Sequence, residues 1–346
     1  MVETIRKITN SIGLPRIIIT LFFILTCVMA FLLKLPIDML TYQILVRIGM
    51  NGVFVLAMVP AILSGTGPNF GLPLGIICGL IGGLMSIELN LYDGWGFAAA
   101  IVIAIPIAVI VGWIYAQLLN RVKGSEMMIA TYTGFSIVFL MSIGWLIMPF
   151  NSPEMVWPIG KGLRVTISLR ERFADILNEL WEFSIGKVKI PTGLLLFFFI
   201  CCLLVWLFLR SKTGLALKAS GANPKFSLAC GINVDKNRII GTILSTVLGA
   251  VGIIVYAQSY GFFQLYQAPL MMAFPAVAAV LIGGASAQKA KISHVILGVF
   301  LFQGLFTVAL PVASSIIKEG NISESLRMIV QNGIILYALT KVNGGE

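Results

Sequence analysis

The chain has 346 residues, of which 58% are apolar and 11% charged, and its formal net charge at pH 7 is +10. An average soluble domain has about 25% charged residues, so this chain has too few polar side chains to cover a soluble surface. The composition excludes a soluble enzyme, a disordered chain and a disulfide scaffold. It favours a bundle of roughly ten membrane-spanning helices.

Apolar runs in chain order predict the spans, because about 20 residues of helix cross the hydrocarbon core of a bilayer. The first run is long and lacks a small-residue cleavage site, so we expect a retained helix and not a signal peptide. The eighth run is short and contains Pro275. The predicted spans are 15–33, 43–64, 70–88, 96–119, 127–148, 191–210, 239–258, 271–286, 292–312 and 325–341.

The distribution of lysine and arginine predicts the topology. With the N-terminus in the cytoplasm, 14 of the 24 basic residues fall in cytoplasmic segments and two, Lys34 and Lys318, in short outer loops. Cytoplasmic loops of membrane proteins are enriched in basic residues, whereas long loops are translocated largely regardless of charge. We therefore expect both termini in the cytoplasm, and we attribute the basic balance to this rule and not to a nucleic-acid partner.

Segment 65–83 has glycine at every fourth position, beginning at Gly67 and ending at Gly83. On a helix this spacing produces a smooth ridge that a neighbouring helix can approach closely. The preceding segment, 64–70, cannot be regular helix throughout, and broken backbone at membrane depth must be buried in protein or line a cavity. A tight turn and a bend lining a pathway are both compatible with this pattern.

The long outer loop, 149–190, has apolar residues with helical spacing between positions 169 and 183. This pattern predicts an amphipathic helix. We expect it to lie on the membrane interface or to cap the bundle, and docking of an external protein is the alternative. The apolar positions are Phe173, Ile176, Leu177, Leu180 and Trp181.

The loop 211–238 is the longest on the cytoplasmic side. Asn223 is a favourable N-cap, Pro224 fits the first helical position and Gly231 fits the position after the last turn. Together they predict a helix of about seven residues, which is too short to be stable without packing. The loop either tucks against the bundle or is received by a cytoplasmic partner.

Catalytic and metal-binding motifs are missing from the sequence. It has no phosphate-binding loop, no nucleophile–base set and no metal-ligand spacing. We read His294 and the five cysteines as structural residues, and we predict no catalytic residue, no bound metal and no cofactor in this chain. Neutral polar groups within the spans suit a hydroxyl-rich solute, although helix–helix hydrogen bonds account for most of them. The candidate pathway residues are Asn51, Asn69, Phe70, Thr131, Thr133, Gln303 and Asn332.

Two stretches of the cytoplasmic loop, 213–224 (TGLALKASGANP) and 229–235 (ACGINVD), resemble the permeases of bacterial ABC importers. The similar family includes the simple-sugar, nucleoside and branched-chain amino acid permeases. Residues 276–284 (AVAAVLIGG) and 129–131 (IAT) also resemble its motifs, and the resemblance covers roughly residues 43–340. The chain departs from the sugar branch at 65–72, where the expected aspartate is missing.

The resemblance implies an all-α, type II ABC importer permease-like bundle of about ten transmembrane helices, with one permease domain over 1–346. It implies that segments 42–148 and 239–341 form an inverted repeat, in a multi-pass protein of the bacterial cytoplasmic (inner) membrane. The chain would be half of a homo- or heterodimer that carries a small polar solute, a monosaccharide or a nucleoside. Two ATPase subunits would bind ATP and Mg²⁺, and an extracytoplasmic solute-binding protein would deliver the solute. The implied ATPase-coupling residues are Asn223, Pro224, Lys225, Phe226, Leu228 and Gly231.

Three other classes of function compete with this interpretation. A self-contained secondary transporter or facilitator would predict buried ion or proton ligands, which the sequence does not show. A structural membrane subunit would not need a capped helix presented to the cytoplasm. An enzyme is the weakest alternative, since no catalytic set is visible.

Overall fold

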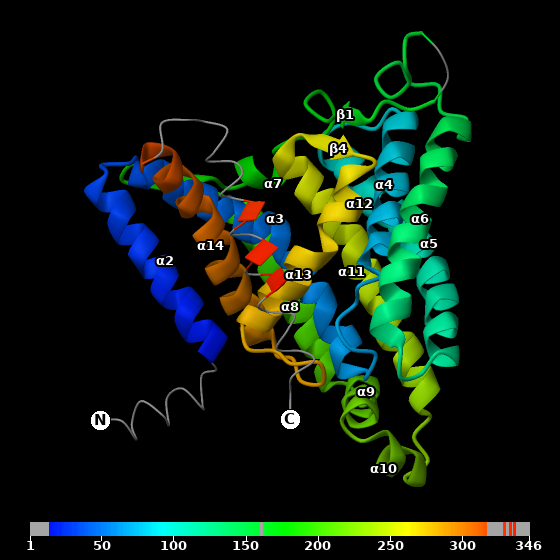
Figure 1. Ribbon diagram of the computed structural model, residues 1–346. Coiled ribbons are helices and arrows are strands. Elements are labelled where there is room, and N and C mark those ends of the chain that lie inside the picture. The colour runs from blue at the N-terminus through cyan, green and yellow to red at the C-terminus, as the bar shows by residue number, and fades with distance from the viewer. Residues whose placement is uncertain (1–13, 160–161, 317–327, 330–331, 334, 337–346) are drawn as a thin grey trace, which may run out of the picture.

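A computed structural model describes residues 14–159, 162–316, 328–329, 332–333 and 335–336. The described part is a bundle of helices with short strands at one end (Figure 1). The helices are α2 (Leu14–Leu32), α3 (Ile37–Leu63), α4 (Leu72–Glu88), α5 (Asp93–Arg121), α6 (Glu126–Ile147), α7 (Ile176–Glu179), α8 (Thr192–Arg210), α9 (Lys212–Ala222), α10 (Pro224–Ala229), α11 (Val234–Tyr260), α12 (Gln267–Met271), α13 (Ala273–Ile282) and α14 (Ile292–Ile316). The strands are β1 (Thr166–Ser168), β2 (Phe183–Ile185), β3 (Val188–Ile190) and β4 (Phe262–Gln264).

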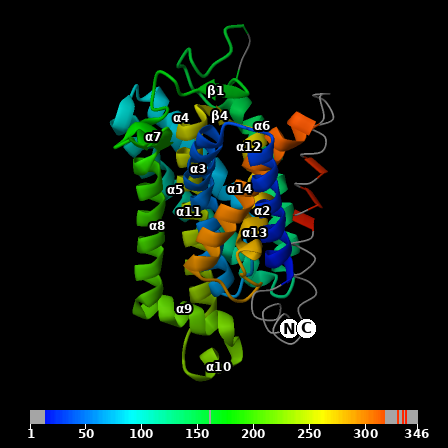
Figure 2. The same cartoon turned by 90° about the vertical axis from the view of Figure 1, so that its left-hand side faces the viewer.

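The two ends of the bundle differ. Helices α9 and α10 project from one end, which we call the α10 end, and strands β1 and β4 lie at the other, which we call the β1 end (Figures 1 and 2). Six of the described helices, α3, α5, α6, α8, α11 and α14, are long and apolar enough to cross a membrane. Helices α2 and α4 and the pair α12–α13 are shorter apolar segments that run between the same two ends.

Nine of the ten predicted spans therefore correspond to a helix or to a helix pair. The eighth, which contains Pro275, is α13 preceded by the short α12. The tenth, 325–341, lies mostly outside the described residues, of which 328–329, 332–333 and 335–336 are helical.

The order of elements from α3 to α5 is repeated from α11 to α14, and the two sets run in opposite directions between the ends of the bundle. Helix α3 has 27 residues. The non-helical segment 64–71, which we call the α3–α4 break, follows it and leads to a 17-residue helix and a 29-residue helix. Helix α11 also has 27 residues, and the broken pair α12–α13 and the 25-residue α14 follow it. Helix α3 runs toward the α10 end and α11 runs away from it (Figure 1). This arrangement agrees with the inverted repeat that the resemblance implies.

The predicted glycine ridge is confirmed on α4. A Cβ atom on Gly75 would collide with the carbonyl oxygen of Thr246, and one on Gly79 with that of Ala250. Both carbonyls belong to α11, so the backbones of α4 and α11 are in direct contact, as small residues permit. Helix α11 also packs against α3 and α5, which places it at the centre of the bundle.

The outer loop corrects the prediction of a long amphipathic helix over 169–183. Only Ile176–Glu179 is helical, because Asp175 and Trp181 have left-handed backbone conformations, with φ of 56° and 53°. The segment is fixed to the bundle by the Asp175 amide, which donates to the carbonyl of Gln258 at 2.8 Å. The apolar periodicity thus reflects packing onto the end of α11, and the loop caps the bundle.

Candidate functional site

The short helix α10 lies at the tip of the α10 end, where the sequence predicts it (Figure 2). The Asn223 side chain caps it by accepting the backbone N–H of Phe226 at 3.0 Å, and Pro224 occupies the first turn. Gly231, just beyond the end, has a φ of +78°, which glycine adopts without strain. The capping residues therefore define this helix locally, as the sequence indicates.

Three large apolar side chains are exposed on this projection. Phe226 is 65% exposed, Leu228 61% and Leu215 of α9 57%. We call them the apolar tip. Lys225 beside them is also exposed, so this surface combines apolar contact area with positive charge. Exposed apolar clusters rimmed by polar groups mark interaction sites in proteins.

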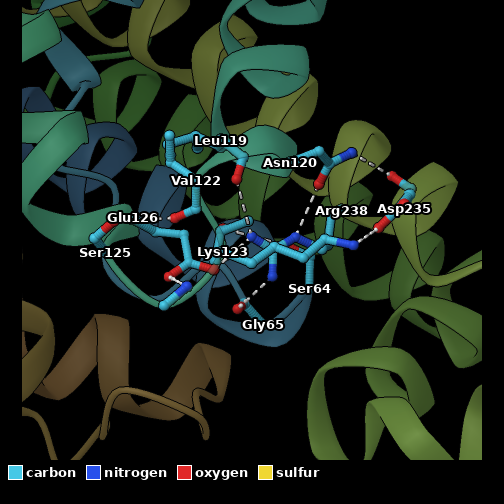
Figure 3. A network of polar contacts seen from close by, with 12 residues as sticks. Ser64, Gly65, Leu119, Asn120, Val122, Lys123, Ser125, Glu126, Asp235 and Arg238 are labelled. Atoms are coloured by element: carbon cyan, nitrogen blue, oxygen red, sulfur yellow. Dashed lines mark hydrogen bonds and ion pairs between the residues drawn. The ribbon is translucent and has the colours of Figure 1, made fainter.

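A buried arginine lies behind this projection and joins several elements (Figure 3). Arg238 of α11 is 8% exposed, and its Nη2 lies 2.6 Å from Oε1 of Glu126 at the start of α6. Its Nε donates to Oδ1 of Asn120 on α5 at 2.9 Å. Weaker contacts reach the carbonyls of Leu119 at 3.4 Å and Gly65 at 3.5 Å. Arg238 therefore connects α11 with α5, α6 and the α3–α4 break.

In the sequence, Arg238 is only one of the basic residues of the predicted cytoplasmic segments. Its partner, Glu126, is 112 positions away along the chain, so no local spacing pairs them. The sequence feature that could have indicated the pair is the scarcity of carboxylates at this end. Within the described residues, the acidic residues there are Glu126 and Asp235. Both have a basic partner in the structure, since Lys123 and Asp235 also form an ion pair.

Helix α9 is bound to the same network. The Nδ2 of Asn237 on α11 donates to Oγ of Ser220 on α9 at 2.8 Å, and Ser220 is fully buried. The backbone of Gly221 lies so close to the α3–α4 break that a Cβ there would collide with the Leu63 carbonyl. The α3–α4 break is thus buried in protein and is in direct contact with α9.

A cavity of about 900 Å³ separates α10 from the bundle. Its walls include Leu228 on α10, Glu126 on α6 and Arg238 on α11. The described residues hold no group of three or more histidine, cysteine, aspartate or glutamate side chains that could bind a metal.

Two candidate pathway residues lie in the α3–α4 break. Asn69 is 5% exposed, donates to Oγ of Ser245 on α11 at 2.8 Å and accepts the Tyr115 hydroxyl of α5 at 3.1 Å. These bonds join α5 and α11 to the break. Phe70 is half-buried and packs on Phe274 of α13, with ring centroids 5.6 Å apart. Asn69 therefore has a helix-joining role, and its place in a pathway stays a prediction.

The other candidate pathway residues do not gather in one site. Thr131 and Thr133 of α6 are half-buried and donate to carbonyls four residues earlier in their own helix, at 2.9 and 2.7 Å. Asn51 of α3 makes the same type of bond at 3.0 Å. Gln303 is buried in α14, and Asn332 is exposed in one of the short described stretches. Their roles in a pathway stay predictions.

A second buried arginine holds the β1 end together. Arg172 is 3% exposed and binds the Glu154 carboxylate with two hydrogen bonds of 2.9 and 2.8 Å. Its Nη2 also donates to Oδ1 of Asn90 at 3.1 Å, and its guanidinium lies 4.3 Å from the ring centroid of Tyr92. The hydrogen bonds from Arg172 lower the pKa of Glu154, although desolvation opposes the effect.

Comparison with protein families gives one model that matches most of the chain. It is described as the permease component of the branched-chain amino acid transport system and matches residues 19–339. That description is of a transport subunit, which agrees with the expectation of a non-catalytic chain.

Two curated proteins are similar over shorter regions. A nucleoside ABC transporter permease, NupC of Lactococcus lactis subsp. cremoris (strain MG1363), is 32% identical over 102 residues, which are 29% of this chain and 32% of that protein. A tyrosine transport system permease of Clostridioides difficile (strain R20291) is 29% identical over 159 residues, which are 45% of this chain and 51% of that protein. The chain thus spans about a third of the first relative and about half of the second. No solved structure matches.

Proposed function

Because the chain belongs to the family of branched-chain amino acid transport system permease components, we propose that it forms the solute pathway of an ATP-driven importer. The apolar tip, on α9 and α10, seats in a groove of a separate ATPase subunit. The observation that carries this proposal is the exposure of Phe226 and Leu228 on a capped helix that projects beyond the bundle. Exposed apolar side chains gathered on one projection mark an interaction surface.

The described cations support a cytoplasmic position for the α10 end. Arg121 and Arg210 end helices there, and Lys123 and Lys212 follow within two residues of those ends. Basic residues concentrate on the cytoplasmic side of membrane proteins. The ATPase would therefore meet the apolar tip from the cytoplasm, and the β1 end would face an extracytoplasmic solute-binding protein.

We propose a nucleoside as the solute, carried by a dimer of permease chains. The similarity to a nucleoside permease supports this choice over a monosaccharide. The missing aspartate at 65–72 also disfavours the sugar branch, and Asn69 stands in that segment as a neutral residue. Closure of the ATPases would displace α9 and α10 and, through Arg238 and the α3–α4 break, rock the bundle between outward and inward access.

The test is co-purification of the chain with the ATPase encoded beside it. Phe226→Asp combined with Leu228→Asp should weaken the association by about 30-fold or more, because two charges would replace central apolar anchors. The matched control is Trp181→Asp combined with Ile185→Asp, which changes two exposed apolar residues at the β1 end. That control should bind the ATPase as the wild type does.

Solute identity needs a separate measurement. Transport of radiolabelled uridine into vesicles that contain the chain, its ATPase and its binding protein should require ATP. Ribose or tyrosine uptake in its place would reject the nucleoside and retain the importer. Wild-type chain that does not bind the ATPase, or binding indifferent to the α10 substitutions, would reject the coupling role and favour a facilitator working without ATP.

A further inference from the structure

A two-stranded hairpin forms the last part of the outer loop, just before α8. Its strands, β2 and β3, pair antiparallel and are joined by the two-residue turn Gly186–Lys187. Gly186 has a φ of +64°, as such turns require at their first position. In a pair of this kind, residues opposite each other have side chains on the same face, and successive residues alternate between faces.

The pairing gives the hairpin one apolar face and one polar face. The apolar face consists of the pairs Phe183–Ile190 and Ile185–Val188, which we call the apolar hairpin face. On the polar face, Ser184 pairs with Lys189. Nζ of Lys189 also lies 2.9 Å from Oε1 of Glu182, so the charges of the hairpin are kept away from its apolar face.

The apolar hairpin face is largely exposed within the described part of the structure. Phe183 is 49% exposed and Ile185 64%, and Trp181, shortly before them, is 68% exposed. Val188 and Ile190 belong to β3, the strand that packs beside α3, and are half-buried. Apolar side chains that gather on one surface in this way mark an interaction site.

Helix α8 fixes the level of the hairpin relative to the bilayer. The Gly193 amide in the first turn of α8 donates to the carbonyl of Leu180 at 2.9 Å, so both ends of the hairpin segment are held at this turn. Helix α8 has 19 residues and is about 28 Å long, which nearly equals the thickness of the hydrocarbon core, about 30 Å. Its first turn therefore lies at the boundary of the hydrocarbon core, and the hairpin lies at the same level.

The same helix presents an exposed apolar stripe to the outside of the bundle. Helix α8 stands at the edge of the bundle (Figure 2). Its exposed residues recur every three or four positions at Leu196, Phe199, Leu203 and Leu207. In a membrane span at the edge of a bundle, such a stripe faces lipid. The hairpin joins α8 at the β1 end of this stripe, so lipid is the nearest apolar medium for its exposed side chains.

We propose that the apolar hairpin face lies in the membrane interface at the β1 end, with its polar face toward water. Burial in lipid removes Phe183 and Ile185 from water. Trp181 belongs to the same contact, since tryptophan is enriched at membrane–water interfaces. The hairpin would thus anchor the outer loop to the membrane beside α8. This surface is at the opposite end from the apolar tip, so its test does not depend on the proposed transport function.

Nitroxide labels at neighbouring positions test this orientation in lipid vesicles that contain the full-length chain alone. Ile185→Cys places the label on the apolar hairpin face, and Ser184→Cys, the matched control, places it on the polar face. Both are made in a chain with Cys27→Ser and Cys230→Ser, since the three other cysteines are buried. The measurement compares collisions of each label with oxygen, which enriches in lipid, and with a water-soluble nickel complex.

The label at position 185 should lie about 5–10 Å below the level of the lipid phosphates, whereas the label at 184 should stay in water. Phe183→Cys should report the same depth as Ile185→Cys, which guards against a distortion at one position. Equal access of the nickel complex to positions 184 and 185 would overturn the proposal. Equal immersion of both positions would also overturn it, because the two faces would then not differ.

Two further outcomes would assign the apolar hairpin face to a protein and reject the lipid. Spin–spin broadening of the label at 185, absent when labelled chain is diluted with unlabelled chain, would assign the face to a second copy. Access of the nickel complex to 185 that is lost only when the solute-binding protein is added would assign the face to that protein.

Discussion

Within the described residues, each end of the bundle contains one nearly buried arginine, and the two have different kinds of partner. Arg172 at the β1 end binds Glu154 of the outer loop 149–190, and Asn90 and the ring of Tyr92 in the α4–α5 connection; we call these two segments the cap. Arg238 at the α10 end binds side chains at the ends of two helices, α5 and α6. One arginine thus holds loop segments together at the β1 end, and the other joins transmembrane helices at the α10 end.

The hydrogen-bond geometry of Arg172 also differs from that of Arg238. Arg172 makes a two-point contact with one carboxylate, at 2.8 and 2.9 Å, which fixes the orientation of both groups. Arg238 divides its two short bonds between Glu126 at 2.6 Å and Asn120 at 2.9 Å, and it has long contacts of 3.4 and 3.5 Å to backbone carbonyls. Long hydrogen bonds are weak, so these contacts can be exchanged at small cost. Arg238 therefore has weak backbone contacts in addition to its two short bonds, whereas Arg172 is held at two points by one carboxylate.

The largest expected effect is that of Arg238→Met. It leaves Glu126 partly buried without its cation, and breaking a buried ion pair in this way costs about 3 kcal/mol or more. Thermal unfolding in detergent should show the loss, and nucleotide hydrolysis by the bound ATPase should become insensitive to solute. Glu126→Gln added to Arg238→Met should recover part of the stability. If the double variant were no more stable than Arg238→Met, the Arg238–Glu126 ion pair would not be the interaction that stabilises the α10 end.

The next effect is that of Arg172→Met at the opposite end. Glu154 is 37% exposed and can return to water, so we expect a smaller loss, about 2 kcal/mol, confined to the cap. Hydrogen exchange over residues 150–175 should accelerate, while solute-stimulated ATP hydrolysis should stay unchanged. If Arg172→Met made ATP hydrolysis insensitive to solute, the two arginines would not have the different roles that we assign to them.

Acid should weaken the cap through Glu154. Arg172 lowers the pKa of this carboxyl in the folded protein below its usual value of 4.5. The contribution of Glu154 is therefore present above about pH 4.5 and is lost as the pH falls through the folded-state pKa. Exchange protection of the cap should decline in that range in the wild type and show no such decline in Arg172→Met. The same acid dependence in both proteins would assign it to other carboxyls.

The smallest effect is expected for Lys123→Met, close to Arg238. Lys123 and Asp235 form an ion pair with side chains that are 51% and 53% exposed. Exposed pairs contribute about 0–1 kcal/mol and are screened by salt. The change in unfolding temperature should be barely measurable and should vanish at high ionic strength. A loss as large as that of Arg238→Met would show that the whole ionic network, and not its buried member, stabilises this end.

The sequence predicts the spans and α10 well because both depend on local causes. Long apolar runs form helices wherever the bilayer surrounds them, and Asn223 and Pro224 define their helix within a few residues. The outer loop is different, since Phe173 packs on Phe263, with ring centroids 5.9 Å apart, and tertiary contact replaces helical periodicity.

Partners distant in sequence explain the rest of what the sequence could not predict. Glu126 pairs with Arg238 across 112 positions, and Asn69 with Ser245 across 176. No local pattern encodes such a separation, so the sequence does not predict the ion pair of Arg238, and it predicts a pathway position for Asn69 without its helix-joining bonds. Polar residues in spans can be recognised from sequence, but their partners cannot.

Helix α11 runs without interruption between the two ends, so we expect it to tilt as a rigid rod. Its interior contains no proline, whereas α3, α5 and α14 contain Pro60, Pro106 and Pro311. It begins shortly after α10, and its other end leads into β4, which pairs with β1 beneath the cap. At 1.5 Å per residue the helix is about 40 Å long, so a tilt of about 5° around its midpoint moves each end by about 2 Å. Such a rigid tilt requires no chain of side-chain rearrangements between the two ends. A distance probe attached to the cap would therefore detect a displacement of α10.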